Sequence, residues 1–589
     1  MKIVSALLIT LLATQTLAQD LGAGGRPVGA DYSRSPVYAQ NGMAATAHPL
    51  ASQVAIDILQ RGGSAMDAAI AANAALGLME PTGNGIGGDL FAIIWDPETR
   101  SLHGYNGSGR SPLGRDLDAL NAAINRLKEA GKLEQDYDGI PSHGSLSVTV
   151  PGTVEAWHAL HQRFGKLDWK RVLEPAIDYA RNGFPVSPVI AYYFERNLQR
   201  FKQVAPLIEE FSNAESTYFK EGRAPVAGEL FTNPDLADTL ALIAKEGSDA
   251  FYTGAIAETI DRYMQDIGGD LRYVDLQAHR GEWVEPLGVE YKGYTLYELP
   301  PNGQGVAALM MLSILKNVDL SQWDRGSPEV FHYMVEAKRL AFADMAASFA
   351  DPDFSAAPLE RLISDEYGKQ QFARINPERA AADYGPSAAV LEGEGDTTYL
   401  TVADKNGMMV SLIQSNYRGM GSGLVPTGLG FMLQDRGELF ALKPEHPNAY
   451  QPGKRPFQTI IPAFLMKGDV PITSFGLMGG GMQPQGHVQM VINWLDFDMN
   501  LQEAGDAARF LHDGGAEPTD RAYSGYGVLL LEPGVPAATV KALEAMGHQV
   551  KIDSTGGAFG GYQAISRDPA TGVLSGATEM RKDGTVAGF

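Results

Sequence analysis

The stretch EGEGDTTYLTVADKNG, residues 392–407, joins two kinds of sequence and decides how the rest of the chain is interpreted. Its first five residues are acidic or glycine, which is typical of an exposed, irregular segment. From Thr397 on, β-branched and aromatic residues predict a strand, and Asn406-Gly407 predicts the tight turn of a hairpin. The two threonines are therefore either ordinary strand residues or the place where the chain is cut.

A threonine at a newly made N-terminus carries its own base, because its α-amine lies within hydrogen-bonding reach of its hydroxyl. The reference pKa of that amine, about 7.7–8.0, leaves a useful neutral fraction near pH 7. Two commoner catalytic motifs are missing: no serine lies in a G-x-S-x-G frame, and the 11 histidines give no H-E-x-x-H. A cut immediately before Thr397 is the catalytic hypothesis that remains, and two ordinary strand residues are still the alternative at this point.

The length and composition of the chain exclude several classes of function. A chain of 589 residues is too long for one ordinary domain, so it forms several folding units or one large α/β unit. The formal net charge of -23 argues against a nucleic-acid partner, because phosphate binding needs a basic surface. Cysteine is absent, which excludes disulfides, thiolate metal sites and a cysteine nucleophile.

The N-terminus has the order of a secretory signal peptide: Lys2, an apolar run over residues 3–13, then small residues ending at Ala18. The apolar run is shorter than the roughly 20 residues that a membrane span needs, so an uncleaved anchor is the weaker alternative. We expect residues 1–18 to be removed and the mature protein, without a membrane span, to be periplasmic or secreted.

The remaining chain reads as helices first and strands later. Gly62-Gly63 ends one predicted helix, and Ser64 caps a second, alanine-rich and buried helix that stops before Pro81. Gly83, Gly85 and Gly88 match G-x-G-x-x-G, but the order is helix, loop, strand, which argues against a dinucleotide site. Residues 381–396 read as an exposed linker between a helix-rich first part and a sheet-rich last part.

Six stretches carry a resemblance to a known family: DILQRGGSAMDAAIAANAALGLMEPTGNGIGGDLFAI, VPGTVEAWHALHQRFGKLDWKRVLEPAI, LPPNGQG, DTTYLTVADKNGMMVSLIQSNYRGMGSG, GKRPFQTIIPAF and FGLMGGGMQPQGHVQMVINWLDFDMNLQEA. With them the chain resembles the gamma-glutamyltransferase (glutathione hydrolase) family of N-terminal nucleophile hydrolases over nearly all of its mature length. The resemblance implies a four-layer αββα sandwich of the α/β class. It also implies self-cleavage between Asp396 and Thr397, giving a heterodimer of a large subunit, 19–396, and a small subunit, 397–589.

The resemblance also implies roles for single residues. Thr397 matches the nucleophile, and Ser415 matches the hydroxyl that holds it. Gly479 and Gly480 match the pair whose backbone N–H groups form the oxyanion hole, and adjacent glycines can point two donors at one developing charge. No metal and no organic cofactor is implied.

The substrate-binding positions depart from the family pattern. Ser108 stands where the family has an arginine that clamps the glutamyl α-carboxylate, and Arg110 follows two residues later. The candidate substrate-binding residues are Arg110, Arg436, Gln458 and Thr459, the last two replacing a serine pair. Leu439 takes the place of the acid that holds the α-amine, with Glu438 beside it, and Tyr417 that of an asparagine.

The sequence therefore predicts a self-processing N-terminal-threonine amidase. Its expected small-molecule substrates are gamma-glutamyl amides, including glutathione, with transfer of the glutamyl group to water or an amine. The departures leave open an acylase or small-amide hydrolase of the same family, similar to cephalosporin acylases. A periplasmic binding protein that keeps the fold without processing or turnover is a third alternative.

Overall fold

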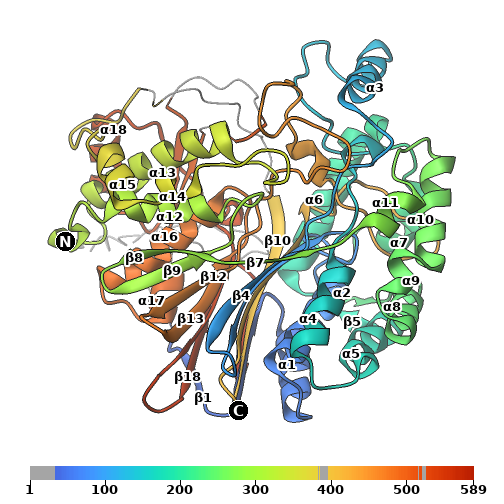
Figure 1. Ribbon diagram of the computed structural model, residues 1–589, viewed down its shortest axis with the longest axis horizontal. Helices are drawn as coiled ribbons and strands as arrows, with labels where there is room; N and C mark the ends of the chain where they lie inside the picture. The colour runs from blue at the N-terminus through green and yellow to red at the C-terminus, as the bar shows by residue number, and fades with distance from the viewer. Residues whose placement is uncertain (1–33, 383, 385–394, 515–516, 520–525) are drawn as a thin grey trace, which may run out of the picture.

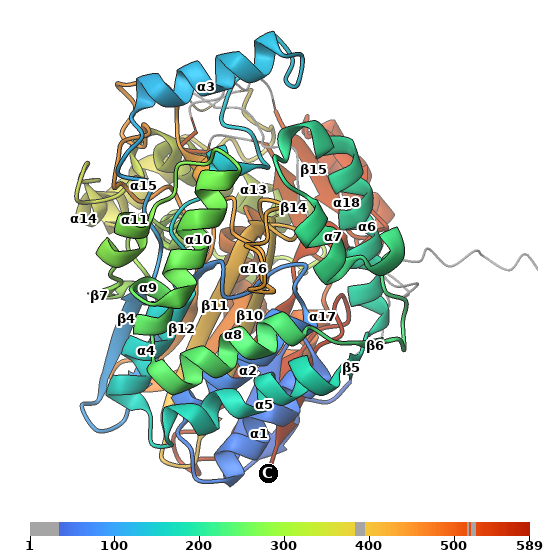
Figure 2. The ribbon, with the colours of Figure 1, turned by 90° about the vertical axis from the view of Figure 1, so that its right-hand side faces the viewer.

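A computed structural model describes residues 34–382, 384, 395–514, 517–519 and 526–589 (Figure 1). The predicted signal peptide and most of the predicted linker lie outside these residues. Two seven-stranded sheets face each other in the middle of the molecule, and helices cover their outer faces (Figures 1 and 2). This arrangement is the expected αββα sandwich.

The first sheet contains the hairpin predicted from residues 397–417. Its strands, in spatial order, are β19 (Thr585–Gly588), β2 (Gly42–Thr46), β10 (Gly395–Asp404), β11 (Met409–Arg418), β3 (Asp89–Asp96), β4 (Ser101–Asn106) and β7 (Glu282–Val284). All neighbouring strands are antiparallel. The hairpin lies at the centre of the sheet, where both of its faces are covered.

The second sheet lies against the first through a shared apolar layer. Its strands, in order, are β1 (Val37–Ala39), β18 (Leu574–Thr578), β17 (Tyr562–Arg567), β13 (Val470–Leu477), β12 (Ala463–Lys467), β9 (Tyr294–Glu298) and β8 (Leu287–Tyr291). Both sheets take strands from both sides of Thr397, so the division into a helix-rich and a sheet-rich part was too simple. Strand pairing across that division would hold two fragments together after a cut.

One helical layer covers the first sheet. It contains α1 (Pro49–Gln60), α2 (Ala65–Met79), α4 (Thr153–Phe164), α5 (Trp169–Asn182) and α8 (Pro234–Glu246). Ser64 caps α2 with a capping box, as predicted, and the helix is buried between α5 and the strands β10 and β11. Its apolar composition on all sides follows from this double burial.

The other helical layer covers the second sheet with α12 (Gly305–Leu315), α13 (Pro328–Ser348), α16 (Met482–Leu495) and α17 (Leu501–Asp506). The other helices are α3 (Leu117–Glu129), α6 (Pro188–Val204), α7 (Ser212–Tyr218), α9 (Asp249–Tyr252), α10 (Ala255–Asp266), α11 (Tyr273–Ala278), α14 (Leu359–Leu362), α15 (Asp365–Phe372) and α18 (Ala537–Ala545). Small sheets are formed by β14 (Phe510–Asp513), β15 (Val528–Leu531) and β16 (Val550–Ile552), and by β5 (Phe184–Pro185) and β6 (Leu230–Phe231).

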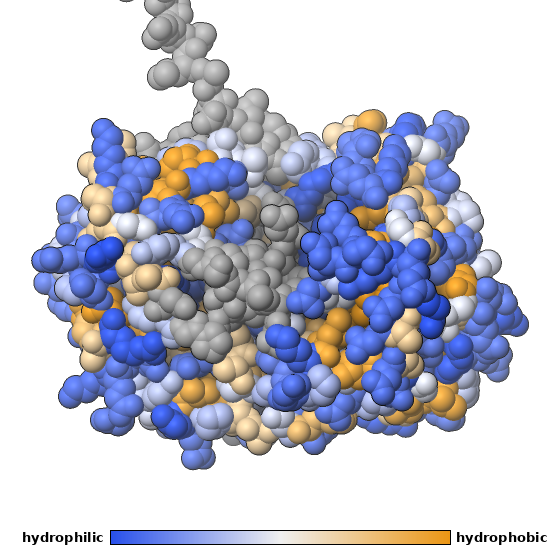
Figure 3. Space-filling view, turned by 90° about the horizontal axis from the view of Figure 1, so that it is seen from above, coloured by the Kyte–Doolittle hydropathy of each residue, from blue (hydrophilic) through white to orange (hydrophobic). Residues whose placement is uncertain are grey.

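The surface fits the acidic composition. Seen from above, hydrophilic side chains dominate, with small apolar areas between them (Figure 3). Within the described residues, no helix is both long enough and apolar enough to cross a bilayer.

Candidate active site

Thr397 lies inside a strand rather than at its start, because β10 begins two residues earlier, at Gly395. The pairing of β10 with β11 shifts by one residue here, so Thr397 faces two residues, Ser415 and Asn416. Such a bulge re-aims side chains and is common beside active sites. The Thr397 side chain is buried.

The Ser415 hydroxyl joins the two atoms that self-cleavage would bring together. It accepts hydrogen bonds from the Thr397 hydroxyl at 3.1 Å and from the Tyr417 N–H at 2.8 Å. It donates to the carbonyl oxygen of Asp396 at 2.9 Å. A hydroxyl has one donor and two acceptor sites, so all the sites of Ser415 are used, and they hold Thr397, the candidate nucleophile, next to this carbonyl.

The glycine-rich loop between α2 and β3 supports this geometry. A Cβ atom at Gly83 would lie 3.1 Å from the Thr397 nitrogen, and one at Gly88 would lie 2.3 Å from the Ser415 carbonyl oxygen. Larger residues would therefore displace the backbone of the nucleophile or of its partner. This close approach of backbones explains Gly83 and Gly88 of the G-x-G-x-x-G pattern, and the φ of 155° at Gly85 favours glycine there.

Contacts between the two sheets locate the residues opposite Thr397. The Tyr399 ring lies against Gly476, where a Cβ atom would be 2.5 Å from the ring, and the hydroxyl oxygens of Thr401 and Ser474 are 2.5 Å apart. For each step toward lower residue numbers on β10, the facing residue on β13 therefore has a higher number. Two residues before Tyr399 is Thr397. Two residues after Gly476 is Met478, which follows the end of β13 and immediately precedes the expected oxyanion glycines.

Gly479 and Gly480 thus lie on the side of the site that faces Thr397. Their φ angles, 120° and 55°, belong to the region that favours glycine. Within the described chain, neither N–H donates a hydrogen bond to another protein group. Both precede α16, whose N-terminal end carries a partial positive charge. This arrangement suits a developing oxyanion.

Arg110 forms ion pairs with acidic side chains of the protein. Its guanidinium lies 3.1 Å from Asp351, 2.8 Å from Asp353 and 3.3 Å from Glu282, and the side chain is a quarter exposed. Ser108, at the family's clamp position, is buried and donates to Asn106. The structure therefore gives Arg110 acidic protein partners and does not bring it to Thr397 by any contact among the described residues.

Arg436 lies closer to the nucleophile. It is fully buried and donates from Nη1 to the Thr459 hydroxyl at 2.7 Å. Its guanidinium carbon lies 4.6 Å from the centre of the Tyr417 ring, and Tyr417 in turn donates its backbone N–H to Ser415. Two of the substrate-binding candidates, Arg436 and Thr459, are therefore linked to Thr397 by a chain of contacts through Tyr417 and Ser415.

Gln458 donates a hydrogen bond to a buried aspartate, Asp89, that the sequence analysis did not single out. Its amide donates to Asp89 Oδ2 at 2.6 Å, and Asp89 Oδ1 accepts from Gln434 and from the backbone N–H groups of Gly109 and Gly152. Burial raises the pKa of Asp89 to about 6. Asp89 therefore connects several loops of the site through hydrogen bonds. In the sequence, its position directly after the glycine loop was the signal that could have pointed to this role.

The family's amine-binding acid has no equivalent side chain here. Leu439 is buried in the apolar core around α12. Both carboxylate oxygens of Glu438 accept from Arg418, at 2.5 and 2.7 Å, in a buried two-point ion pair. These residues supply no acid to a substrate amine at this position.

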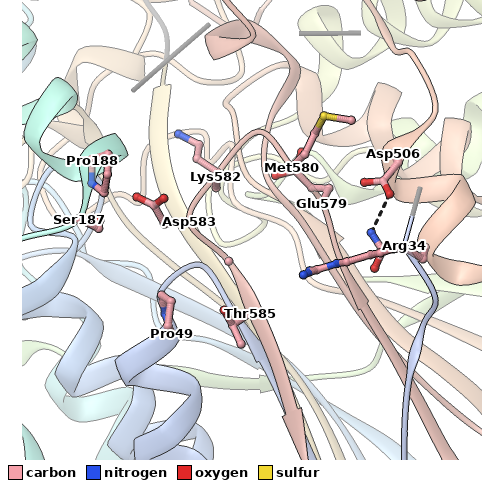
Figure 4. A pocket seen from close by; sticks show the side chains of 12 residues that line it. Arg34, Pro49, Ser187, Pro188, Asp506, Glu579, Met580, Lys582, Asp583 and Thr585 are labelled. Atoms are coloured by element: carbon pink, nitrogen blue, oxygen red, sulfur yellow. Dashed lines mark hydrogen bonds between the residues drawn. The ribbon is translucent and has the colours of Figure 1, made fainter. Parts of the chain in front are cut away.

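A second group that the sequence analysis missed, Glu80, lies beside the residue that follows Thr397. Glu80 accepts a hydrogen bond from the Thr398 hydroxyl at 2.8 Å, and burial raises its pKa to about 8. The Lys582 ammonium lies 4.0 Å from Asp396 Oδ1. Lys582 also lines a surface cavity of about 600 Å³, in which Asp583 comes from the same segment and Arg34 from another (Figure 4).

The start of the predicted linker is docked rather than loose. Glu336 accepts from the Ala381 N–H at 3.1 Å and from the Tyr384 hydroxyl at 2.5 Å. His332 and His548, 2.8 Å apart, lie beside it, and their donor atoms and those of Glu336 come within 4.8 Å of one another. Since these atoms already bond each other, Arg339 or residues 376, 381 and 384, the group fits a structural clamp better than a metal centre.

Comparison with known proteins assigns the family. The sequence model of the Gamma-glutamyltranspeptidase family matches residues 51–589. This chain belongs to that family. It is 36% identical over 547 residues to the glutathione hydrolase-like YwrD proenzyme of Bacillus subtilis, which covers 93% of this chain and 98% of that protein.

Acylases are also among the relatives of this gamma-glutamyltranspeptidase family member. The acylase ACY 1 proenzyme of a Pseudomonas species is 33% identical, over 94% of each chain. The crystal structure of cephalosporin acylase from Bacillus halodurans superimposes with a TM-score of 0.86 and 41% identity, covering 95% of this chain and 98% of that one. The fold is therefore that of the N-terminal nucleophile hydrolases.

Proposed function

We propose that this protein cuts its own Asp396–Thr397 bond and then hydrolyses amides with Thr397 as an N-terminal nucleophile. The supporting observation is the contact of one hydroxyl, that of Ser415, with both the Thr397 hydroxyl and the Asp396 carbonyl oxygen. A plain strand residue has no need of this arrangement.

Processing follows from these contacts. The Thr397 oxygen attacks the Asp396 carbonyl carbon, and Ser415 donates to the carbonyl oxygen as it becomes negative. The C–N bond breaks, the nitrogen takes the proton from the threonine hydroxyl, and an ester remains. Water then cleaves the ester, which leaves a carboxylate on Asp396 and a free α-amine on Thr397.

Turnover repeats the chemistry on a substrate. The new α-amine accepts the hydroxyl proton as Thr397 attacks the amide carbonyl, and the backbone N–H groups of Gly479 and Gly480 stabilise the oxyanion. The amine passes the proton to the leaving nitrogen, so the leaving group departs as an amine. Water, or an acceptor amine, then releases the acyl group from Thr397.

For the substrate we propose an acylase or small-amide hydrolase in preference to a glutathione hydrolase. A gamma-glutamyl substrate presents an α-carboxylate and an α-amine, and the positions that hold them in the family are occupied here by Ser108 and Leu439. Arg110, the nearest replacement, has three acidic partners. The similarity to solved cephalosporin acylase supports the same choice.

The test is a denaturing gel followed by a substrate panel. Purified protein should separate into two copurifying bands corresponding to residues 19–396 and 397–589, and should hydrolyse short acyl or glutaryl anilides faster than gamma-glutamyl anilide. A single band of full mature length without turnover would support the binding-protein alternative. Two bands with a clear preference for the gamma-glutamyl anilide would return the substrate to the glutathione hydrolase class. Export, which we also propose from residues 1–18, is tested by cell fractionation.

A further inference from the structure

Arg436 is fully buried, and within the described part of the chain its one hydrogen bond goes to the Thr459 hydroxyl. Among the described residues it forms no ion pair, and its Nε and Nη2 atoms have no hydrogen-bond partner. Of the acids around it, Asp89 accepts four hydrogen bonds, and Glu438 is held at both oxygens by Arg418. Asp435 accepts the Arg418 N–H through Oδ1, and its Oδ2 makes no hydrogen bond to Arg436. A buried charge without compensation is costly, so such a group calls for a specific role.

The position of Arg436 connects it to both halves of the catalytic centre. On one side its guanidinium stacks on Tyr417, whose N–H binds Ser415. On the other side it donates to Thr459, whose carbonyl oxygen accepts from the Gln304 amide at 2.5 Å. The same Gln304 nitrogen donates to the Gly480 carbonyl oxygen at 2.8 Å. The Gln304 side chain, acting through Thr459, thus fixes the position of Arg436 relative to the oxyanion glycines.

The backbone supports a built site at this point. Tyr417 has a φ of 79°, a conformation that is strained for an aromatic residue and needs its surroundings to hold it. The Tyr417 ring lies against the guanidinium, and this contact together with the Thr459 hydrogen bond restricts the position of Arg436. A fixed planar fork is what two-point recognition of a carboxylate requires.

We propose that Arg436 binds a carboxylate at the far end of the substrate's acyl group, so that the enzyme prefers amides of dicarboxylic acids. This inference rests on the proposed amidase function and specifies which acyl groups the amidase prefers. Nε and Nη2 lie on one edge of the guanidinium and supply the two donors, while Nη1 stays on Thr459. The acyl carbonyl then lies between Arg436 and Thr397, next to Gly480.

The experiment compares matched anilides with the processed enzyme. The acidic series is succinyl, glutaryl and adipyl anilide, and the neutral partner of the glutaryl compound is butyryl anilide, which keeps the chain but lacks the distal carboxylate. The variants are Arg436→Lys, which keeps the charge and loses the fork, and Arg436→Gln. The control is Arg110→Gln, since Arg110 is the rival clamp.

In the parent enzyme we expect kcat/KM to be higher for the best acidic anilide than for butyryl anilide. Both Arg436 variants should lose about 30-fold or more on the acidic substrate and much less on the neutral one. Arg110→Gln should change both equally. Free glutarate should inhibit butyryl anilide hydrolysis by the parent, and this inhibition should weaken in the Arg436 variants.

The outcomes separate this inference from the function on which it rests. Two bands on a gel show that each variant folds and processes, so a loss confined to acidic substrates cannot come from misfolding. Equal losses on acidic and neutral anilides, or a selective loss in Arg110→Gln, would overturn the assignment to Arg436 while leaving the amidase intact. A parent enzyme that processes but hydrolyses no anilide would overturn the proposed function instead.

Discussion

The Ser415 hydroxyl lies 2.9 Å from the carbonyl oxygen of Asp396, and it is the donor in that contact. In the uncut chain this carbonyl is therefore polarised by a side chain of β11, whereas Gly479 and Gly480 lie across the site at the end of β13. Processing and turnover would thus draw on different oxyanion donors, and substitutions can separate the two stages.

The first prediction concerns the site of the cut. Sequencing of the smaller fragment should begin Thr-Thr-Tyr. Thr397→Ala should leave a single uncut and inactive chain, because the missing oxygen is the attacking atom in both stages. Thr397→Ser keeps the hydroxyl and should still cut. Normal processing of the alanine variant would mean that another protease makes the cut.

The second prediction concerns Ser415. Ser415→Ala removes the donor to the Asp396 carbonyl and the acceptor for the Thr397 hydroxyl, so processing should slow by about 100-fold or more, the usual effect of losing one oxyanion donor. Ser415→Thr keeps the hydroxyl and is the matched control. The rate is read from the conversion of precursor to fragments on a gel. If the alanine variant cuts as fast as the parent, Ser415 has no part in processing.

The third prediction separates turnover from processing. Gly480→Ala places a side chain at a φ of 55° and should shift the N–H away from the oxyanion. We expect normal processing and a kcat lowered by about 100-fold. Gly481→Ala is the control, because Gly481 has a φ of -67° and the nearest atom to an added Cβ is 3.9 Å away. Loss of processing in Gly480→Ala but not in the control would place Gly480 in the first stage as well.

Local sequence signals predicted the elements around the nucleophile correctly. The Ser64 cap, the Asn406-Gly407 turn and the buried helix before Pro81 depend on neighbouring residues, and all are confirmed. The αββα fold came from the resemblance rather than from periodicity. The start of β10 was misjudged because its first residues pair with β11, an interaction that composition does not reveal.

The polar residues of the site were harder to predict because their roles depend on contacts between distant segments. Arg110 is drawn away by Asp351 and Asp353, more than 240 positions later in the chain. Arg436 forms no ion pair among the described residues, and the nearby Glu438 is already bound by Arg418. A single sequence shows which charges exist, but it does not show which of them are paired.

The last prediction concerns Glu80 and pH. Its pKa is raised from 4.5 to about 8 by burial next to Thr398, so the folded protein holds a proton that the unfolded chain releases above pH 4.5. Stability is therefore lost as pH rises from about 4.5 to about 8, at about 1.4 kcal/mol per pH unit, and Glu80→Gln should not suffer this loss. The variant should melt higher than its parent at pH 8, with the difference vanishing near pH 4. Melting should be followed in the uncut Thr397→Ala background, so that one chain unfolds, with the exposed Glu98→Gln as the control. A difference that does not change with pH would show that Glu80 is already ionised in the folded protein.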